Sequence, residues 1–326
     1  MEKKSQPIRD EYGCIERESD RRDFFKRIAA VSAGMMAVSS VKPTHANSFP
    51  KETKLNPGKM PKIKLGGVPV SRLIMGGNPI GGYSHRGRML SDIMKEWYTD
   101  DRILELLHHA EACGITTWQT GLGKELADVW LRYKREGGKM NLIVLTRLDD
   151  PETIKWLATV KPMALIHHGE VTDIMWREGR IDTLIPQLEA VRNAGMKVAV
   201  STHNPDCLRY MDKHQWDVDF FLTCFYEISK KQKHWKEDLG WQPLHEVYPE
   251  PAPATMTAAV RDVSKPCLGF KILAAGRVEK EEAIEQAYKF AFDNIKQTDG
   301  VIVGMFPKFS DQIAEGARHT VQYGRV

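Results

Sequence analysis

The stretch that decides the fold is residues 181–203, which read IDTLIPQLEAVRNAGMKVAVSTH. Its first half repeats apolar residues at the three- and four-residue spacing of a helix, at Ile181, Leu184, Ile185, Leu188 and Val191. Gly195 then stops the helix, as glycine commonly does just past a helical C-terminus. The run Lys197–Thr202 is almost continuously apolar, which fits a strand buried on both faces of a parallel sheet. The stretch therefore predicts one helix–strand unit of an α/β fold.

Seven further short apolar runs have the same character, and longer amphipathic stretches such as Asp101–Cys113 and Lys280–Ile295 lie between them. The eight predicted strands are Arg72–Gly76, Thr116–Thr120, Leu142–Arg147, Met163–His168, Lys197–Thr202, Phe220–Tyr226, Pro266–Leu273 and Gly300–Met305. Eight strands alternating with helices predict a (β/α)8 TIM barrel. The competing fold is an open doubly wound sheet, which the even spacing and the lack of a GxGxxG after the first run disfavour.

Three other segments surround this repeating pattern. Lys62–Val70 alternates around a Gly-Gly pair and predicts an N-terminal β-hairpin. The Pro-, Lys-, Asn- and Ser-rich residues 47–61 are interpreted as a linker, which leaves residues 62–326 for the hairpin and the barrel. Between the sixth and seventh runs, Lys230–Pro253 is long and polar. We interpret it as a lid or binding loop, because connections of this length in a compact domain are usually functional.

The overall composition argues against several classes of protein. The 326 residues are 42% hydrophobic, which suffices for a large core without support from disulfides or metals. The formal net charge of +4 and the lack of a basic run argue against a nucleic-acid partner. Five scattered cysteines, without CxxC or Cys/His spacing, argue against a disulfide framework and a structural zinc site.

The first 46 residues resemble an export signal. Arg21 and Arg22 precede a short, weakly hydrophobic stretch at residues 28–38, and small residues follow it up to Ala46. This order is similar to a twin-arginine signal peptide, so we expect cleavage after Ala46 and a periplasmic or extracellular location. The export machinery would then be a partner, and the apolar stretch is too short for a stable membrane span. An amphipathic N-terminal helix is the alternative interpretation.

Polar side chains gather at the C-terminal ends of the predicted strands, where barrels of this kind carry their chemistry. The candidate catalytic residues are His167, His168, His203, Lys271, Tyr226 and Arg147. Since side chains alternate along a strand, only one of His167 and His168 can face the barrel mouth. We expect His167, His203 and Lys271 to converge within about 10 Å at the mouth, the scale of one small-molecule pocket. The same cavity is expected to contain Glu170, Arg147 and Asn78.

Several stretches, in their order and spacing, resemble the aldo-keto reductases. They are Leu65–Gly77, Gly114–Thr120, Leu165–His168, Ala194–Ser201 and Val303–Glu315. The resemblance covers residues 62–318 and implies a barrel that holds NADP and a small carbonyl substrate. It places cofactor contacts at Ser201 and Asn204 for the carboxamide, at Phe270 for the nicotinamide ring, at Gly276 and Arg277, and at Lys308 for the ribose phosphate.

The catalytic residues of that family are largely replaced in this chain. The family uses an Asp, a Tyr as proton donor, a Lys and a His. Gln119 stands at the Asp position, Arg147 stands at the Lys position, and residues 121–125 contain no Tyr, so only His167 matches. A glutamine carries no charge that could shift a neighbouring pKa, and an arginine does not readily release a proton. The proton relay of the family therefore cannot operate here in its usual form.

Three functions remain open from the sequence. The first is an exported aldo-keto reductase-like oxidoreductase that uses NADP, with His167 or Tyr226 as proton donor. The second is a non-redox lyase, isomerase or hydrolase acting on a carbohydrate. In it, His167 or His168, Glu170 and His203 bind a divalent metal or act as acid and base, and Lys271 stabilises an oxyanion. The third is a catalytically inactive barrel that only binds its ligand.

Overall fold

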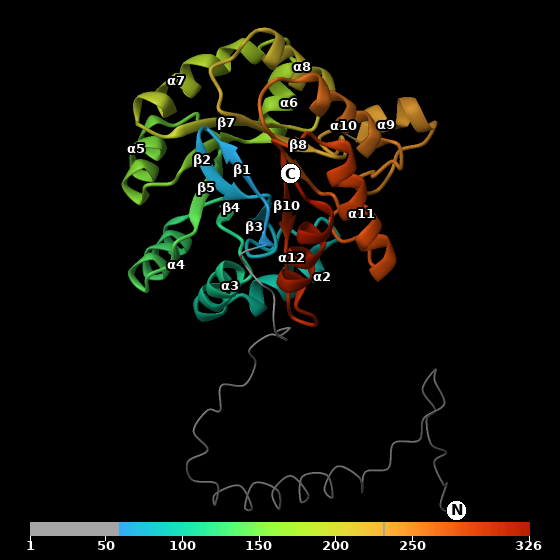
Figure 1. Ribbon diagram of the computed structural model, residues 1–326. Helices are drawn as coiled ribbons and strands as arrows, with labels where there is room; N and C mark the ends of the chain where they lie inside the picture. The colour runs from blue at the N-terminus through green and yellow to red at the C-terminus, as the bar shows by residue number, and fades with distance from the viewer. Residues whose placement is uncertain (1–58, 231) are drawn as a thin grey trace, which may run out of the picture. The chain divides into compact units, whose positions relative to one another are not determined.

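The computed structural model describes residues 59–230 and 232–326. The predicted signal peptide, residues 1–46, and most of the predicted linker lie outside the described residues. Within them, eight parallel strands close into a barrel in the order β10-β3-β4-β5-β6-β7-β8-β9 (Figure 1). The strands are β3 (Leu73–Gly76), β4 (Thr117–Thr120), β5 (Asn141–Thr146), β6 (Ala164–His167), β7 (Lys197–Thr202), β8 (Phe220–Cys224), β9 (Cys267–Phe270) and β10 (Gly300–Gly304). The predicted (β/α)8 TIM barrel is confirmed.

Every barrel strand is followed by at least one helix, and the helices surround the strands (Figure 1). They are α2 (Arg88–Trp97), α3 (Asp100–Ala112), α4 (Lys124–Arg135), α5 (Pro151–Val160), α6 (Gly169–Arg177), α7 (Ile185–Asn193), α8 (Pro205–Lys213), α9 (Gln232–Leu239), α10 (Ala252–Asp262), α11 (Glu281–Asn294) and α12 (Gln312–Tyr323). The helix predicted over Ile181–Ala194 is divided into a 3-10 turn, Ile181–Leu184, and α7. Pro186 explains the division, because it lacks the N–H that would continue an α-helix from residue 182. None of the helices within the described ranges has the length and apolar character needed to cross a membrane.

The predicted hairpin closes the N-terminal end of the barrel. Strands β1 (Lys62–Leu65) and β2 (Val68–Ser71) pair antiparallel, with Leu65 opposite Val68. The buried side chains of Ile63, Leu65 and Val70 join the cluster that fills the barrel interior. The hairpin therefore plugs the end where the strands begin, and the opposite end is left for a site.

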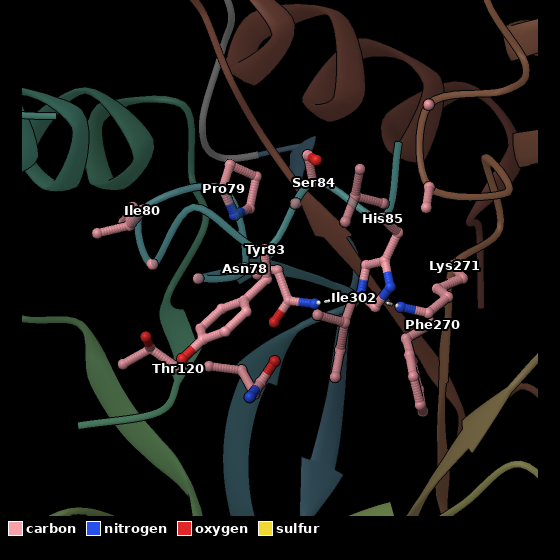
Figure 2. Close-up of a pocket in the computed structure, with 18 of the residues that line it drawn as sticks. Asn78, Pro79, Ile80, Tyr83, Ser84, His85, Thr120, Phe270, Lys271 and Ile302 are labelled. Atoms are coloured by element: carbon pink, nitrogen blue, oxygen red, sulfur yellow. Dashed lines mark hydrogen bonds between the residues drawn. The ribbon is translucent and has the colours of Figure 1, made fainter. Parts of the chain in front are cut away.

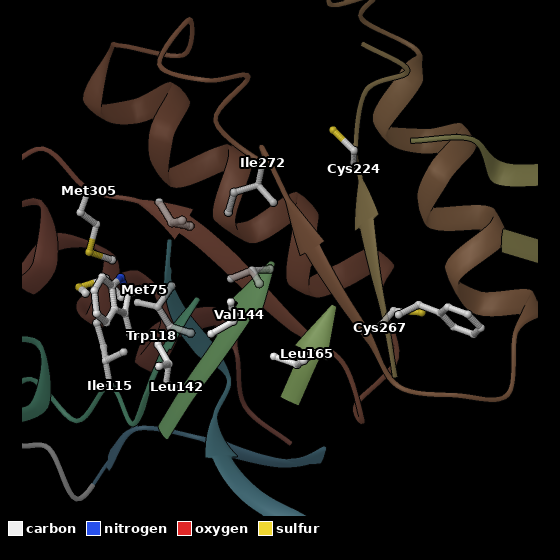
Figure 3. Close-up of a cluster of buried hydrophobic side chains, with 14 of the residues drawn as sticks. Met75, Ile115, Trp118, Leu142, Val144, Leu165, Cys224, Cys267, Ile272 and Met305 are labelled. Atoms are coloured by element: carbon white, nitrogen blue, oxygen red, sulfur yellow. The ribbon is translucent and has the colours of Figure 1, made fainter. Parts of the chain in front are cut away.

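A second apolar layer lies between the strands and the helices (Figure 3). Along β5 and β6, Val144 and Leu165 belong to this outer layer, whereas Ile143 and Ile166 belong to the barrel interior. Successive side chains thus point to opposite faces, as expected for a strand. Both layers are equally apolar, so hydrophobicity alone does not reveal which residues of a strand point inward.

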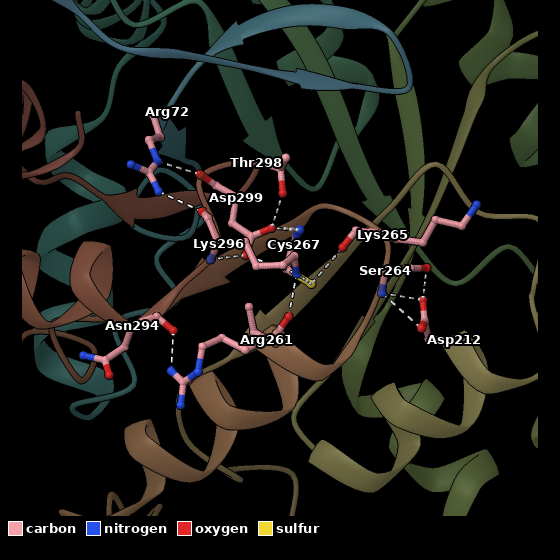
Figure 4. Close-up of polar contacts among 11 residues, drawn as sticks. Arg72, Asp212, Arg261, Ser264, Lys265, Cys267, Asn294, Lys296, Thr298 and Asp299 are labelled. Atoms are coloured by element: carbon pink, nitrogen blue, oxygen red, sulfur yellow. Dashed lines mark hydrogen bonds and ion pairs between the residues drawn. The ribbon is translucent and has the colours of Figure 1, made fainter. Parts of the chain in front are cut away.

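A buried polar network joins the beginnings of three strands (Figure 4). Arg72, only 2% exposed, donates from Nε to the carbonyl of Asp299 and from Nη2 to that of Lys296, both at 2.8 Å. The Asp299 carboxylate accepts the backbone N–H groups of Cys267 and Lys296 at 2.8 Å. Burial raises the pKa of Asp299, and the Lys296 ammonium, 3.2 Å away, opposes that rise. The network holds β3, β9 and β10 together far from the barrel mouth.

Candidate functional site

A cavity of about 1440 Å³ opens at the C-terminal ends of the strands. Of the residues expected at this site, those lining the cavity are His168, His203, Lys271, Arg147, Ser201, Phe270, Gly276, Asn78 and Glu170. Those that lie elsewhere are His167, Tyr226, Asn204, Arg277 and Lys308. Barrel closure therefore brings residues at the C-terminal ends of β5, β6, β7 and β9 to one place, as expected for His203 and Lys271.

The expectation that His167 faces the barrel mouth is wrong, because the inward and outward positions along the strand are shifted by one residue. Ile166 points into the barrel, so His167 points outward, where its Nδ1 lies 2.7 Å from the hydroxyl of Thr172 in α6. Burial lowers the pKa of His167 to about 4, which keeps the ring neutral. His168, the next residue, lines the cavity instead.

His168 presents an unsatisfied polar atom at this site. Its Nδ1 is buried and has no hydrogen-bond partner in the described part of the chain. Burial lowers its pKa, although the nearby Glu170 carboxylate opposes that effect. A buried ring nitrogen without a partner is costly, so a bound water or ligand hydroxyl would stabilise this position.

His203 forms a hydrogen-bonded pair with Asp173, a residue of α6 that sequence reasoning missed. Its Nδ1 lies 2.7 Å from Oδ2 of Asp173, whose side chain is completely buried. The carboxylate also accepts the hydroxyl of Thr202 at 2.5 Å and the backbone N–H of His203 at 3.1 Å. Because a carboxylate only accepts, Nδ1 carries the hydrogen and Nε2 of the neutral ring keeps a free lone pair for the cavity. The signal in the sequence is an aspartate among apolar residues of α6, since a buried charge requires a partner.

A second histidine–carboxylate pair, His85 and Glu246, also lines the cavity, and sequence reasoning missed it too. His85, in the loop after β3, places Nδ1 2.9 Å from Oε1 of Glu246, in the loop after α9. Its Nε2 lies 2.8 Å from Nζ of Lys271 and 3.4 Å from the amide nitrogen of Asn78 (Figure 2). These residues are far apart in the sequence, and no local motif marks them.

The partners of His85 fix the position of its hydrogen. Glu246 only accepts hydrogen bonds, so Nδ1 of His85 carries the hydrogen. Lys271 and the Asn78 amide nitrogen both donate, so Nε2 accepts. Burial lowers the pKa of Lys271, which makes its ammonium a better proton donor. Burial raises the pKa of Glu246, but the hydrogen bonds from His85 and Tyr248 and the positive charge of Lys271 oppose it, and the pKa is lowered overall.

The backbone is strained at both ends of the contact between Lys271 and His85. Their φ angles are 60° and 56°, in the left-handed region that non-glycine residues rarely occupy. Such a conformation costs on the order of 1 kcal/mol or more for each residue and typically persists at functional sites. Two strained residues that bond each other across 186 positions of sequence indicate a geometry fixed by the surrounding structure.

Arg277 and Asn204, both expected to contact a cofactor, have structural partners instead. Arg277 donates from Nη2 to the carbonyl of His85 at 2.9 Å and lies 3.9 Å from the centroid of the Tyr248 ring. It therefore braces the loop that carries His85. Asn204 caps α8 through its side-chain oxygen and donates its amide to Glu227 at 3.1 Å. Tyr226 is buried against Tyr248, with ring centroids 4.9 Å apart.

Phe270 lies near both His203 and Lys271. Its ring centroid lies 5.5 Å from that of His203 and 5.9 Å from Nζ of Lys271. A molecule lying on Phe270 is therefore within reach of both groups. Ser201, beside Gly169 at the start of α6, lines the same region.

The lining offers few groups that suit a metal ion or a dinucleotide phosphate. Among the residues described, no three His, Cys, Asp or Glu side chains gather as a metal site would require. Three of the lining cations, Arg86, Arg147 and Lys230, are paired with the carboxylates of Glu279, Asp149 and Asp238. Lys308 is exposed and does not line the cavity. The nicotinamide end of an NADP site is thus represented by Ser201 and Phe270, but the phosphate end is not, and the residues present do not fit the whole cofactor.

No family model matches this chain, and no curated protein matches it. Solved structures similar to it include an aldo-keto reductase from Bacillus halodurans, with 13% identity over 80% of this chain and 91% of that chain and a TM-score of 0.49. They also include a truncated 3-deoxy-D-arabino-heptulosonate 7-phosphate synthase from Thermotoga maritima (12% identity, 81% and 90% covered, TM-score 0.47). A dihydropteroate synthase from Yersinia pestis shows 11% identity over 80% and 98% of the two chains, with a TM-score of 0.44. Three different activities at such low similarity favour none of them for this chain.

Proposed function

We propose that this protein is an enzyme that moves protons at the carbon next to a carbonyl group of a small hydroxylated substrate. This reaction class includes isomerases and lyases acting on sugar-like molecules. The proposal is carried by one observation: two histidines, each bonded through Nδ1 to a carboxylate, line the same cavity as Lys271. Separated acid and base groups of this kind are what such proton transfer requires.

The positions suggest the role of each group. With the substrate on Phe270, its carbonyl oxygen is oriented toward the Lys271 ammonium and its neighbouring C–H bond toward Nε2 of His203. His203 takes the proton, and the C–H electron pair moves into the C–C bond between the α-carbon and the carbonyl carbon. Lys271 stabilises the negative charge that develops on the carbonyl oxygen. Asp173 stabilises the imidazolium that forms. Return of the proton to the former carbonyl carbon, with the neighbouring hydroxyl proton passing to the first oxygen, gives an isomer. Departure of a β-hydroxyl that takes the proton from the His203 imidazolium gives water and an elimination product.

The remaining lining groups suit a polar substrate. His168, Glu170 and Gln119 offer ring, carboxylate and amide groups for hydroxyls. Trp235 and the 68% exposed Tyr83 line the same cavity and offer faces on which a sugar ring packs.

The test is hydrogen exchange with solvent. The purified protein, without added metal or nucleotide, is incubated in D2O with a panel of small hydroxyketones and aldoses, and deuterium at the α-carbon is followed by NMR. We expect exchange that His203→Gln slows by at least about 100-fold, the lower range for loss of a general base. A panel without any exchange above buffer would contradict the proposal and favour a barrel that only binds ligand.

A second candidate, an NADP-dependent aldo-keto reductase-like oxidoreductase, is favoured by Ser201 and Phe270 lining the cavity where the resemblance places the carboxamide and nicotinamide. Its test is titration of the protein with NADPH while tryptophan fluorescence is recorded. Saturable quenching that Phe270→Ala weakens would support it. Absence of NADPH binding would exclude this second candidate, so that only the non-redox proposal would remain. Export by the twin-arginine route remains part of either proposal, on the strength of Arg21, Arg22 and the segment after them.

A further inference from the structure

Lys271 has the surroundings of a nucleophile rather than those of a simple charged group. Cationic lysines usually pair with a carboxylate or with water, as Lys230 pairs with Asp238 in the same cavity. The partner of Lys271 is instead the unprotonated Nε2 of His85, 2.8 Å away. That histidine is in turn oriented by Glu246. The arrangement places a base and an orienting carboxylate behind an amine, which is the general pattern of an activated nucleophile.

We propose that Lys271 attacks the substrate carbonyl and forms a covalent iminium with it, with His85 as the proton carrier and Glu246 as the residue that positions His85. The proposal rests on the proposed function, since it specifies how the same lysine activates the same carbonyl group. It also narrows the substrate class to aldehydes and ketones, because esters, amides and carboxylates do not form stable iminium ions with an amine.

The step balances in atoms and charge. His85 takes one proton from the ammonium, and the freed lone pair of Nζ forms a bond to the carbonyl carbon while the C=O electrons move to oxygen. That oxygen receives two protons in all, both originally on Nζ and both carried by His85, and leaves as water. The remaining C=N⁺–H keeps the single positive charge of the original ammonium. The neighbouring C–H bond is now acidified, and His203 takes its proton to give the enamine.

Three further features of the site agree with this role. Burial lowers the pKa of Lys271, which increases the fraction of free amine. The surrounding structure keeps Lys271 and His85 in strained backbone conformations at their point of contact. The bond from Arg277 to the carbonyl of His85, with Arg277 packed on Tyr248, keeps the loop in place.

The experiment traps the iminium by reduction. The protein is incubated with dihydroxyacetone and cyanoborohydride, digested, and analysed by mass spectrometry for the reduced adduct at each lysine. We expect Lys271 to be labelled at least tenfold faster than Lys230, which lines the same cavity and serves as the internal reference. His85→Gln and Glu246→Gln should each slow labelling at Lys271, while Lys289→Arg, on α11 outside the cavity lining, should leave it unchanged. Thermal melting of each variant verifies that it is folded.

A second readout separates this proposal from the proposed function. Lys271→Arg keeps a positive charge but cannot form an iminium, so α-hydrogen exchange should fall by more than 100-fold. Exchange retained by Lys271→Arg, or labelling of Lys271 no faster than that of Lys230, would overturn the iminium while leaving proton transfer intact. Selective labelling of Lys271 without exchange of any substrate would instead support the iminium and contradict the proposed function.

Discussion

Replacing Asp173 by asparagine tests how the buried carboxylate controls His203. The side chain keeps its shape, but one of its two oxygens becomes an amide that donates. Oδ1 accepts from Thr202 and Oδ2 accepts Nδ1–H of His203, so the new amide takes the position that faces the ring. It then donates to Nδ1, which moves the ring hydrogen to Nε2 and removes the lone pair that would receive the substrate proton.

The expected magnitude follows from this change of tautomer. A base held in the wrong tautomer loses roughly 10³–10⁴-fold in rate, which is about 4–5 kcal/mol in barrier height. Loss of a charge-assisted hydrogen bond in a buried site should also lower the free energy of unfolding by about 1–3 kcal/mol. The assays are α-hydrogen exchange in D2O for the rate and urea unfolding for the stability.

Asp299→Asn is the matched control for this experiment. Asp299 is also completely buried and also accepts backbone N–H groups, but it belongs to the network at the opposite end of the barrel. The control should lower stability and leave the exchange rate within about twofold, since its site has no contact with the cavity. If Asp173→Asn also kept the exchange rate within a few-fold, the role assigned to the Asp173–His203 pair would be refuted.

Further predictions concern targeting, pH dependence and helix capping. Replacing Arg21 and Arg22 by lysine should leave the precursor in the cytoplasm, as cell fractionation would show, and normal export would refute the twin-arginine interpretation. The pKa of His167 is lowered to about 4 in the fold, so the stability it contributes is present above about pH 6.5 and is lost as the pH falls toward 4. Between pH 7 and pH 4, the wild type should therefore lose about 3 kcal/mol more unfolding free energy than His167→Asn, and equal losses would contradict the assignment. Lys161 ends α5 with φ of 57°, so Lys161→Gly should raise the unfolding free energy by about 0.5–1 kcal/mol, and a lower melting temperature would contradict this.

The strands could be predicted from the sequence because a parallel sheet buried on both faces leaves continuous apolar runs. Their ends could not be predicted as well. β8 ends at Cys224 and β9 at Phe270, so Tyr226 and Lys271 lie in loops rather than in strands. Strand ends depend on pairing with both neighbours, which a single sequence does not show.

Which of the two neighbouring histidines, His167 or His168, faces the cavity could not be predicted for a related reason. Leu165 and Ile166 are equally apolar, so nothing in β6 distinguishes the face toward the helices from the face toward the barrel interior. His203 and Lys271 were found because a rule of the fold points to strand ends. Asp173, His85 and Glu246 come from a helix and two loops. Only the closed barrel places Asp173 behind His203 and brings His85 and Glu246 to the same cavity.

The proposed chemistry requires two histidine rings that carry hydrogen on Nδ1 and keep Nε2 as an acceptor, His203 for the substrate and His85 for Lys271. Two-bond ¹H–¹⁵N correlation NMR of the uniformly labelled protein measures this directly, with His85→Gln and His203→Gln identifying the two spin systems. We predict the Nδ1–H tautomer for both rings at neutral pH, and a shift of the His85 Nε2 signal when Lys271 is replaced by methionine. Finding hydrogen on Nε2 of both rings would contradict the account, because neither histidine could then accept a proton from the substrate or from Lys271.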